Sequence, residues 1–196
     1  SLLQIFKKRI SQTFDVFMIT IIPIILGAQA VGVELINFIA GNDYEAAGNV
    51  LQILVLDIIG IFLGGLFGNL VVAINKQKQM IFGYALVAIV TLPGYFYFIP
   101  LYGMWGAAWM TIFSETLIAL FTFIMVYKHS KARPGLLIFL KSLTASIVMF
   151  FIIDILPETH VVIDILVGIL SYIVIMFIIK GIKTEEMKNL LPKKTI

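Results

Sequence analysis

The sequence contains no cysteine. A chain without thiols has no disulfide framework, no thiolate metal site and no thiol nucleophile, so redox chemistry and cysteine-based catalysis are excluded. Charged residues are also scarce, at 13% of the chain. Soluble globular domains carry about 25% charged residues. Water is therefore not expected to be the main solvent of this protein.

No group of residues points to catalysis. The two histidines, His129 and His160, fall in loops that we expect at opposite membrane faces, so they cannot converge on a metal ion or a triad. No glycine-rich phosphate loop precedes a helix in a βαβ setting. We therefore expect no enzyme, no cofactor and no metal site. Basic residues lie at the ends of apolar runs, which indicates membrane topology rather than nucleic-acid binding.

Long apolar runs dominate what is present. The 196-residue chain is 61% hydrophobic, with a mean hydropathy of +1.07. Each run approaches or exceeds the ~20 residues that a helix needs to cross a bilayer core. The runs lack period-two alternation, which excludes a porin-type barrel and favours helices. We predict an all-α, polytopic integral membrane bundle with six transmembrane helices, over residues 14–39, 46–74, 80–99, 104–127, 136–156 and 161–179.

Polar segments separate these helices. Residues 1–13 mix three basic residues with apolar ones and are typical of an interfacial amphipathic segment, the end of an upstream element. Residues 14–127 then hold four transmembrane helices, 128–135 a basic loop and 136–180 an additional helix pair. Residues 181–196 form a polar tail with a short helix expected over 184–191. The additional pair is apolar nearly all round, so we expect it to be peripheral and to face lipid.

Lysine and arginine fall at one set of predicted helix ends: Lys7, Lys8, Arg9, Lys76, Lys78, Lys128, Lys131, Arg133, Lys141 and the residues from Lys180 onward. The opposite turns carry acidic residues instead, namely Asp43, Glu45, Asp154 and Glu158. The positive-inside rule predicts that the basic side is cytoplasmic. Both termini are then cytoplasmic.

Three acidic residues, Glu34, Asp57 and Glu115, lie well inside predicted spans, whereas Asp15, Asp154 and Asp164 lie close enough to helix ends to be interfacial. An acid inside a span costs ~3 kcal/mol or more, so it normally faces the bundle or water. Asp57 and Glu115 share a depth of roughly 16 Å, at 1.5 Å per residue from their helix starts. Both lie on small or polar stripes, which suggests a cation pathway. The alternative is an acid that is protonated or hydrogen-bonded to a neighbouring helix. For Glu34, nearer the outer surface, a solvated or headgroup-facing role is favoured.

Helix-breaking residues fall inside two predicted spans. Pro23 removes a backbone hydrogen bond in the first span, and Pro93 with Gly94 does so in the third. Broken helices mark binding sites in many transporters, although proline and glycine are also common in ordinary spans. We treat all three as candidate kinks.

Several segments together resemble the C-terminal half of polysaccharide and O-antigen flippases, the oligosaccharide-lipid exporters of the MOP superfamily. The resemblance covers residues 14–127 and is carried by Pro23, the turn 41–46, residues 51–54, the stretch from Asn69 to Lys78, and residues 99–108. It implies a MATE-like fold of two six-helix lobes around a cavity, in the bacterial cytoplasmic membrane. The first four helices of this chain would be the last four helices of the C-terminal lobe. The N-terminal lobe would precede them in the sequence. Asn69 joins the acids as a pathway candidate.

The resemblance also implies a function. Such proteins move an undecaprenyl-diphosphate-linked oligosaccharide across the membrane by alternating access, and some are coupled to Na⁺ or H⁺. One departure is that no Lys or Arg lies in the middle of a predicted span, since Lys141 is near the start of its span. A diphosphate lipid needs cationic partners, which must then come from the N-terminal lobe or the cytoplasmic rim. Two alternatives remain open: a cation-coupled drug antiporter of the same fold, and a membrane scaffold without transport activity.

Overall fold

The computed structural model describes residues 2–131, 134–157 and 160–181. Within these ranges the chain is helical and contains no strand. The elements are α1 (Leu2–Ala40), the short 3₁₀ helix η1 (Asn42–Tyr44), α2 (Glu45–Leu54), α3 (Asp57–Ala73), α4 (Gln77–Ser130), α5 (Leu137–Ile155) and α6 (Val161–Ile178). The prediction of an all-α chain is confirmed. The tail helix expected over 184–191, together with Arg133, Glu158 and Thr159, lies outside the described residues.

Helix α1 is continuous from Leu2 to Ala40, so residues 2–13 belong to the same helix as the first predicted span. No glycine or proline interrupts the sequence before Pro23, and α1 also continues past this proline. Gly41, with a φ of 98°, then ends the helix in a conformation that suits glycine.

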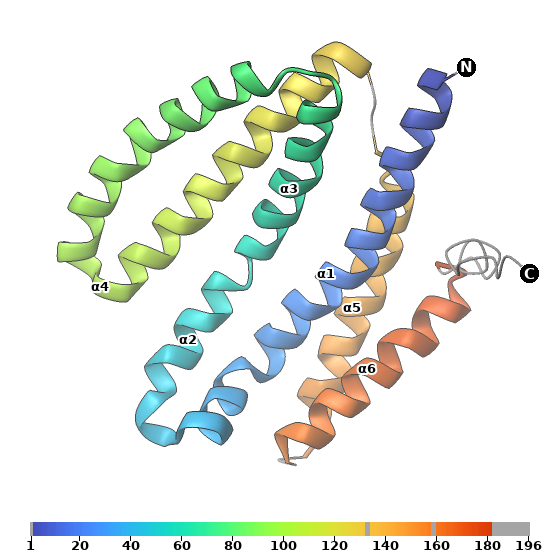
Figure 1. The fold of residues 1–196 in the computed structure, drawn as a ribbon. Coiled ribbons are helices and arrows are strands. Elements are labelled where there is room, and N and C mark those ends of the chain that lie inside the picture. Colours follow the sequence, from blue (N-terminus) through green and yellow to red (C-terminus); the bar gives the residue numbers. More distant parts are fainter. Residues whose placement is uncertain (1, 132–133, 158–159, 182–196) are drawn as a thin grey trace, which may run out of the picture.

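Helix α4 reverses direction within one long element. Gly103 has non-helical torsion angles, φ 55° and ψ −131°, and divides α4 into two legs that lie side by side (Figure 1). The hydroxyl groups of Tyr95 and Thr111 join the legs at 3.0 Å. The reversal lies at the turn that the sequence predicts near residue 103. Helical backbone continues through the candidate kink at Pro93 and Gly94.

The sequence predicts one helix over residues 46–74, but the structure divides it into α2 and α3. The two helices meet at 40° across Val55 and Leu56. Figure 1 shows α2 running beside the lower part of α1, while α3 lies beside α4. The break therefore lies where the chain passes from one packing neighbour to another.

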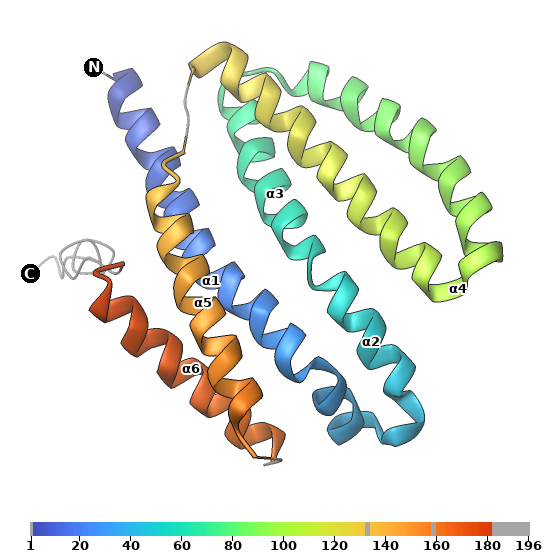
Figure 2. The same cartoon turned by 180° about the vertical axis from the view of Figure 1, so that it is seen from behind.

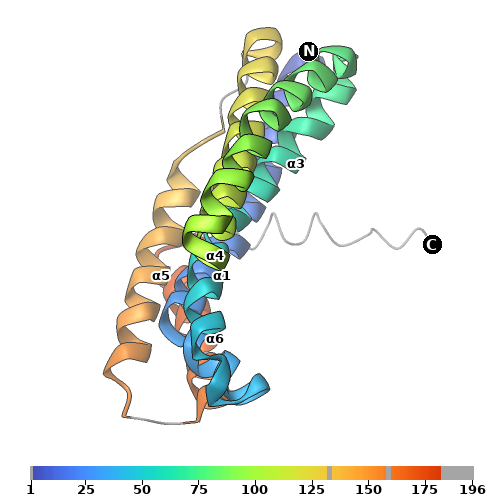
Figure 3. The ribbon, with the colours of Figure 1, turned by 90° about the vertical axis from the view of Figure 1, so that its left-hand side faces the viewer.

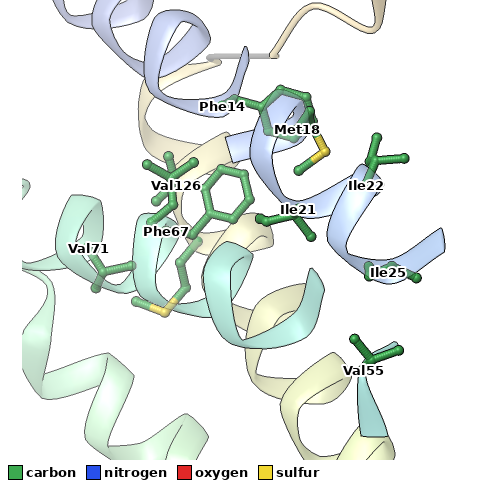
Figure 4. Packing of buried hydrophobic residues seen from close by; sticks show 11 residues of the cluster. Phe14, Met18, Ile21, Ile22, Ile25, Val55, Phe67, Val71 and Val126 are labelled. Carbon is green, nitrogen blue, oxygen red and sulfur yellow. The ribbon is translucent and has the colours of Figure 1, made fainter. Parts of the chain in front are cut away.

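Two apolar clusters hold the helices together, and α1 contributes to both. The first joins α1 to α3 and to the second leg of α4; Figure 4 shows Phe67 and Val126 beside Met18 and Ile21. The second joins α1 to α5 and α6 through residues such as Val31, Met149 and Met176. Seen from behind, α5 and α6 lie together along α1 (Figure 2). Helix α1 is thus the central element.

The described residues contain four helices long and apolar enough to cross a membrane, or up to five if α2 and α3 count as one bent span. Their long axes share a general direction, as the edge-on view shows (Figure 3). Large apolar side chains are widely exposed, including Phe96 at 81% and Ile155 at 80%. So much exposed apolar surface would favour aggregation in water. A lipid surrounding removes that cost, as expected for a membrane-embedded protein.

The basic segments gather at one end of the bundle. The N-terminal turns of α1, the α3–α4 turn and the end of α4 lie together at the top of Figure 1. The side chain of Lys141, at the start of α5, donates to the carbonyl of Lys180 at 2.9 Å, so the start of α5 lies close to the end of α6. Turn 41–44 and the Gly103 reversal lie at the opposite end.

Candidate functional site

The break between α2 and α3 has a specific cause in the hydrogen bonding. The amides of Leu56, Ile58 and Ile59 bond to carbonyls three residues earlier, at 3.0, 3.2 and 3.4 Å. A regular α-helix would use carbonyls four residues earlier. The carbonyl of Gln52, which would then accept from Leu56, instead accepts from the side-chain amide of Gln29 on α1. A side chain inserted into the backbone ladder is a known cause of kinks.

The Gln29 and Gln52 side chains exchange hydrogen bonds. Gln52 Nε2 donates in turn to the backbone carbonyl of Gln29 at 2.9 Å, so each amide satisfies the other residue's carbonyl. Gly32 allows this approach, because a Cβ there would lie 3.3 Å from Cγ of Gln52. The two glutamines therefore fasten the end of α2 to α1 directly before the break. The two glutamines were not predicted as a pair from the sequence. A glutamine in each of two apolar spans is the pattern that could have indicated a hydrogen bond between the helices.

Asp57 is the first residue of α3 and is only 4% exposed. Its Oδ1 atom has no hydrogen-bond partner among the described residues. A buried polar atom without a partner is uncommon in proteins and calls for a specific explanation. The dipole of α3 favours a carboxylate at its first residue, although the amides of Ile58 and Ile59 are already bonded to the carbonyls of Val55 and Leu56.

Glu115, on the second leg of α4, lies against the same turn. A Cβ placed on Gly60 would be 3.0 Å from Cβ of Glu115 and 3.3 Å from Oδ1 of Asp57. The absent side chain of Gly60 is thus what allows the two acids to approach. The structure brings together two residues that are 58 positions apart in the sequence. Their shared depth, predicted from helix spacing, corresponds to real proximity.

Glu115 also reaches an open groove. The groove has a volume of about 340 Å³ and runs between α3 and α4. Its lining combines small, polar and apolar residues: Gly64, Gly65, Gly68, Asn69, Val72, Met80, Tyr84, Glu115 and Ile118. Because the glycines of α3 have no side chains to fill the space, the groove stays open beside Glu115. Asp57 is enclosed, whereas Glu115 is half-buried and borders accessible space.

Asn69 lies in this groove and also borders a second one of about 440 Å³ between α1 and α3. Its side chain is exposed, which is unusual for an amide within a span. Glu34 lies elsewhere: with Asp154 and Asp164 it lines a pocket of about 520 Å³ between α1, α5 and α6. The structure therefore groups Asp57, Glu115 and Asn69 but leaves Glu34 apart.

Pro23 is tied to the additional helix pair. Proline at this position leaves the carbonyl of Ile19 without its usual helical donor. The hydroxyl of Tyr172 on α6 donates to that carbonyl at 2.7 Å. Ser142 on α5 donates to the neighbouring carbonyl of Met18 at 3.0 Å and lies 2.9 Å from the Tyr172 hydroxyl. Sequence analysis missed Ser142 and Tyr172; the carbonyl freed by Pro23 is the signal that predicts a donor from another helix.

The arrangement suits a small cation. Two carboxyl groups close together beside an open groove can bind a proton or a monovalent metal ion and release it, provided that water reaches Glu115. Among the described residues, no three histidine, cysteine, aspartate or glutamate side chains are grouped so that they could hold a metal ion. Any ion would therefore need oxygen ligands from backbone carbonyls, amides or water in addition to the two acids.

No family model, no curated protein and no solved structure matches this chain.

Proposed function

We propose that this protein moves an undecaprenyl-diphosphate-linked oligosaccharide across the bacterial cytoplasmic membrane by alternating access. The observation that carries the transport part of the proposal is the pairing of Asp57 and Glu115 at a helix break. Discontinuous membrane helices with ionisable groups at the break are a recurring feature of ion-coupled transporters. The substrate class rests on the resemblance of the turn and span motifs.

In this proposal the chain has six spans, of which the first four are the last four helices of a MATE-like C-terminal lobe and the last two are an additional pair. The two legs of α4 count as separate spans, and α2 with α3 counts as one broken span. The positive-inside rule then supports an orientation with both termini in the cytoplasm, since the described lysines lie at one set of helix ends. A second lobe would face this one across the substrate cavity.

Burial supports a transport role over a scaffold role. In a scaffold, each acid would be packed against neighbours and fully hydrogen-bonded, because an unpaired buried polar group costs about 1–3 kcal/mol. Here Oδ1 of Asp57 has no partner among the described residues, and Glu115 borders a groove of about 340 Å³. A protein normally keeps an unpaired buried acid, with its cost in stability, only where that acid binds a ligand or an ion.

One observation favours a cation-coupled drug antiporter as the second candidate. None of the described residues that line the groove beside Glu115 is a lysine or arginine, so these residues offer a diphosphate no cationic partner. An antiporter for cationic drugs needs acids without bases. In the flippase account, cationic partners come from the second lobe or from the basic rim.

A reconstitution experiment separates these functions. The protein is placed in liposomes with an undecaprenyl-diphosphate-linked oligosaccharide, and transport is read from the access of an impermeant glycosidase to the sugar. A parallel set of liposomes measures efflux of ethidium. We expect movement of the saccharide lipid and no drug efflux. Drug efflux without saccharide movement would favour the antiporter, and neither activity would favour the scaffold.

A further inference from the structure

A groove of about 430 Å³ opens between the two legs of α4, at the end of the bundle where the basic segments gather. It is separate from the groove that Glu115 lines and from the Asp57–Glu115 pair. Its rim carries Lys78 from the first turn of α4 and Lys128 and His129 from the last turn. Residues about fifty positions apart thus face one opening. Among the described residues, no acidic side chain lines it.

The groove walls are apolar. They consist of Phe82, Phe121, Ile124 and Met125, below the rim of Lys78, Gln79, Lys128 and His129. Phe82 is 71% exposed and Ile124 is 41% exposed. A basic rim above an open apolar wall matches the two parts of a phospholipid, a phosphate headgroup and an acyl chain.

The packing beneath the rim fixes the shape of the groove. The ring of Phe121 occupies space that only glycine leaves free at position 83, so the two legs meet here at close range. The His129 ring is held by a hydrogen bond from its Nδ1 atom to the carbonyl of Met125 at 2.9 Å. Lys78 and Lys128 are therefore presented by helix turns whose separation is set by packing rather than by a mobile loop.

We propose that this groove binds the headgroup of an anionic phospholipid from the membrane leaflet on the basic side. Basic pockets between membrane helices commonly bind such headgroups. The phosphate lies between Lys78 and Lys128, and an acyl chain runs along Phe82 and Ile124. A zwitterionic phosphatidylcholine binds more weakly, because its choline group brings a positive charge to the same rim. This site is independent of the transported substrate.

Native mass spectrometry of the purified protein tests the site. Phosphatidylglycerol and phosphatidylcholine of equal chain length are titrated onto wild type, onto the double variant Lys78→Gln/Lys128→Gln and onto the control Lys8→Gln/Arg9→Gln. The control removes the same charge from the exposed start of α1 on the same side. We expect wild type and control to prefer phosphatidylglycerol by about tenfold, or ~1.4 kcal/mol. The groove variant loses that preference. Unchanged melting temperatures in phosphatidylcholine establish that each variant is folded.

Further arms separate the sources of the phosphate. Phe82→Ala should weaken phosphatidylglycerol binding severalfold, and inorganic phosphate should not compete at equal concentration, because both results require a bound acyl chain. Equal losses in the groove and control variants would overturn the proposal in favour of diffuse surface charge. Displacement of phosphatidylglycerol by a stoichiometric amount of undecaprenyl diphosphate would also overturn it, by assigning the groove to the transported lipid.

Discussion

At the residue scale, Gly60 determines whether Asp57 and Glu115 can meet. Any side chain at this position would contact Cβ of Glu115 at 3.0 Å and its backbone carbonyl carbon at 3.2 Å. Gly65, five residues later on the same helix, faces open space with nothing within 4 Å of a Cβ. Two glycines of one helix therefore have different roles: one is required by packing and the other is not.

We predict that Gly60→Ala destabilises the protein, whereas Gly65→Ala does not. The added methyl group at position 60 forces α3 away from α4, and such overpacking costs about 1–3 kcal/mol. At position 65 alanine meets no neighbour and is favoured in a helix by up to ~1 kcal/mol. Melting temperatures of the two variants in one detergent provide the comparison. Equal melting temperatures for both would contradict the close approach of Glu115 to α3.

At the element scale, the additional pair α5 and α6 is fastened to the central helix by more than apolar contact. Tyr172 and Ser142 satisfy carbonyls beside Pro23. A helix that only faced lipid would have no need of these bonds. The outer faces of α5 and α6 expose large apolar side chains, while their inner faces complete the backbone bonding of α1.

Tyr172→Phe should therefore destabilise the protein by about 1–3 kcal/mol, the cost of leaving a buried carbonyl without a donor. Pro23→Ala restores a backbone amide that can donate to the carbonyl of Ile19. Tyr172→Phe should therefore destabilise the Pro23→Ala protein less than it destabilises wild type. Thermal unfolding of the four proteins in this double-mutant cycle measures the coupling, which we expect to be about 1 kcal/mol. Tyr97→Phe, at an exposed ring, is the control. Purely additive effects would mean that the bond to Ile19 does not depend on the proline.

The break between α2 and α3 is a second feature of this scale. Gln29→Met removes the donor to the Gln52 carbonyl and frees the end of α2 from α1. Hydrogen exchange at residues 53–58 should then become roughly fivefold faster, as expected for a net hydrogen bond of ~1 kcal/mol. Exchange along α4 should not change. Gln77→Met, at an exposed position, controls for loss of an amide. An effect confined to α1 would show that the glutamine does not hold the break.

Hydropathy and charge were sufficient to predict the helical class and the turns at residues 41–45 and 103. The membrane depth assigned to Asp57 and Glu115 stays a prediction, and the structure adds that the two residues are close together. The break at Val55 and Leu56 was not predictable from its own residues, because no proline or glycine marks it and its cause is a side chain from α1. The partners of Pro23 were missed for the same reason. Both features depend on which helices become neighbours, and hydropathy does not carry that information.

At the scale of the whole molecule, the proposed orientation rests on the one-sided distribution of lysine and arginine. The absence of native cysteine allows single reporter thiols to be read without background. We predict that Asn42→Cys is labelled by an impermeant maleimide from the outside, and that Lys78→Cys and Lys131→Cys are labelled from the inside. Thr159→Cys, outside the described residues, should behave like Asn42→Cys. Labelling of Asn42→Cys from the cytoplasmic side alone would invert the proposed orientation.

The proposed function requires that Asp57 and Glu115 make transport dependent on a cation. A group that binds and releases a cation must replace its lost hydration with charge and must face water from each side in turn. Asp57→Asn and Glu115→Gln preserve shape and remove only the charge. Asp43→Asn and Glu45→Gln remove charge from the exposed outer turn and serve as matched controls.

The most direct measurement is movement of the saccharide lipid in proteoliposomes, with and without an imposed Na⁺ or H⁺ gradient, for wild type, the two amide variants and the two controls. We predict that the gradient accelerates wild type and both controls, and that Asp57→Asn and Glu115→Gln fold normally but no longer respond. Rates for both amide variants within about twofold of wild type, where tenfold corresponds to ~1.4 kcal/mol, would contradict a coupling role for the pair.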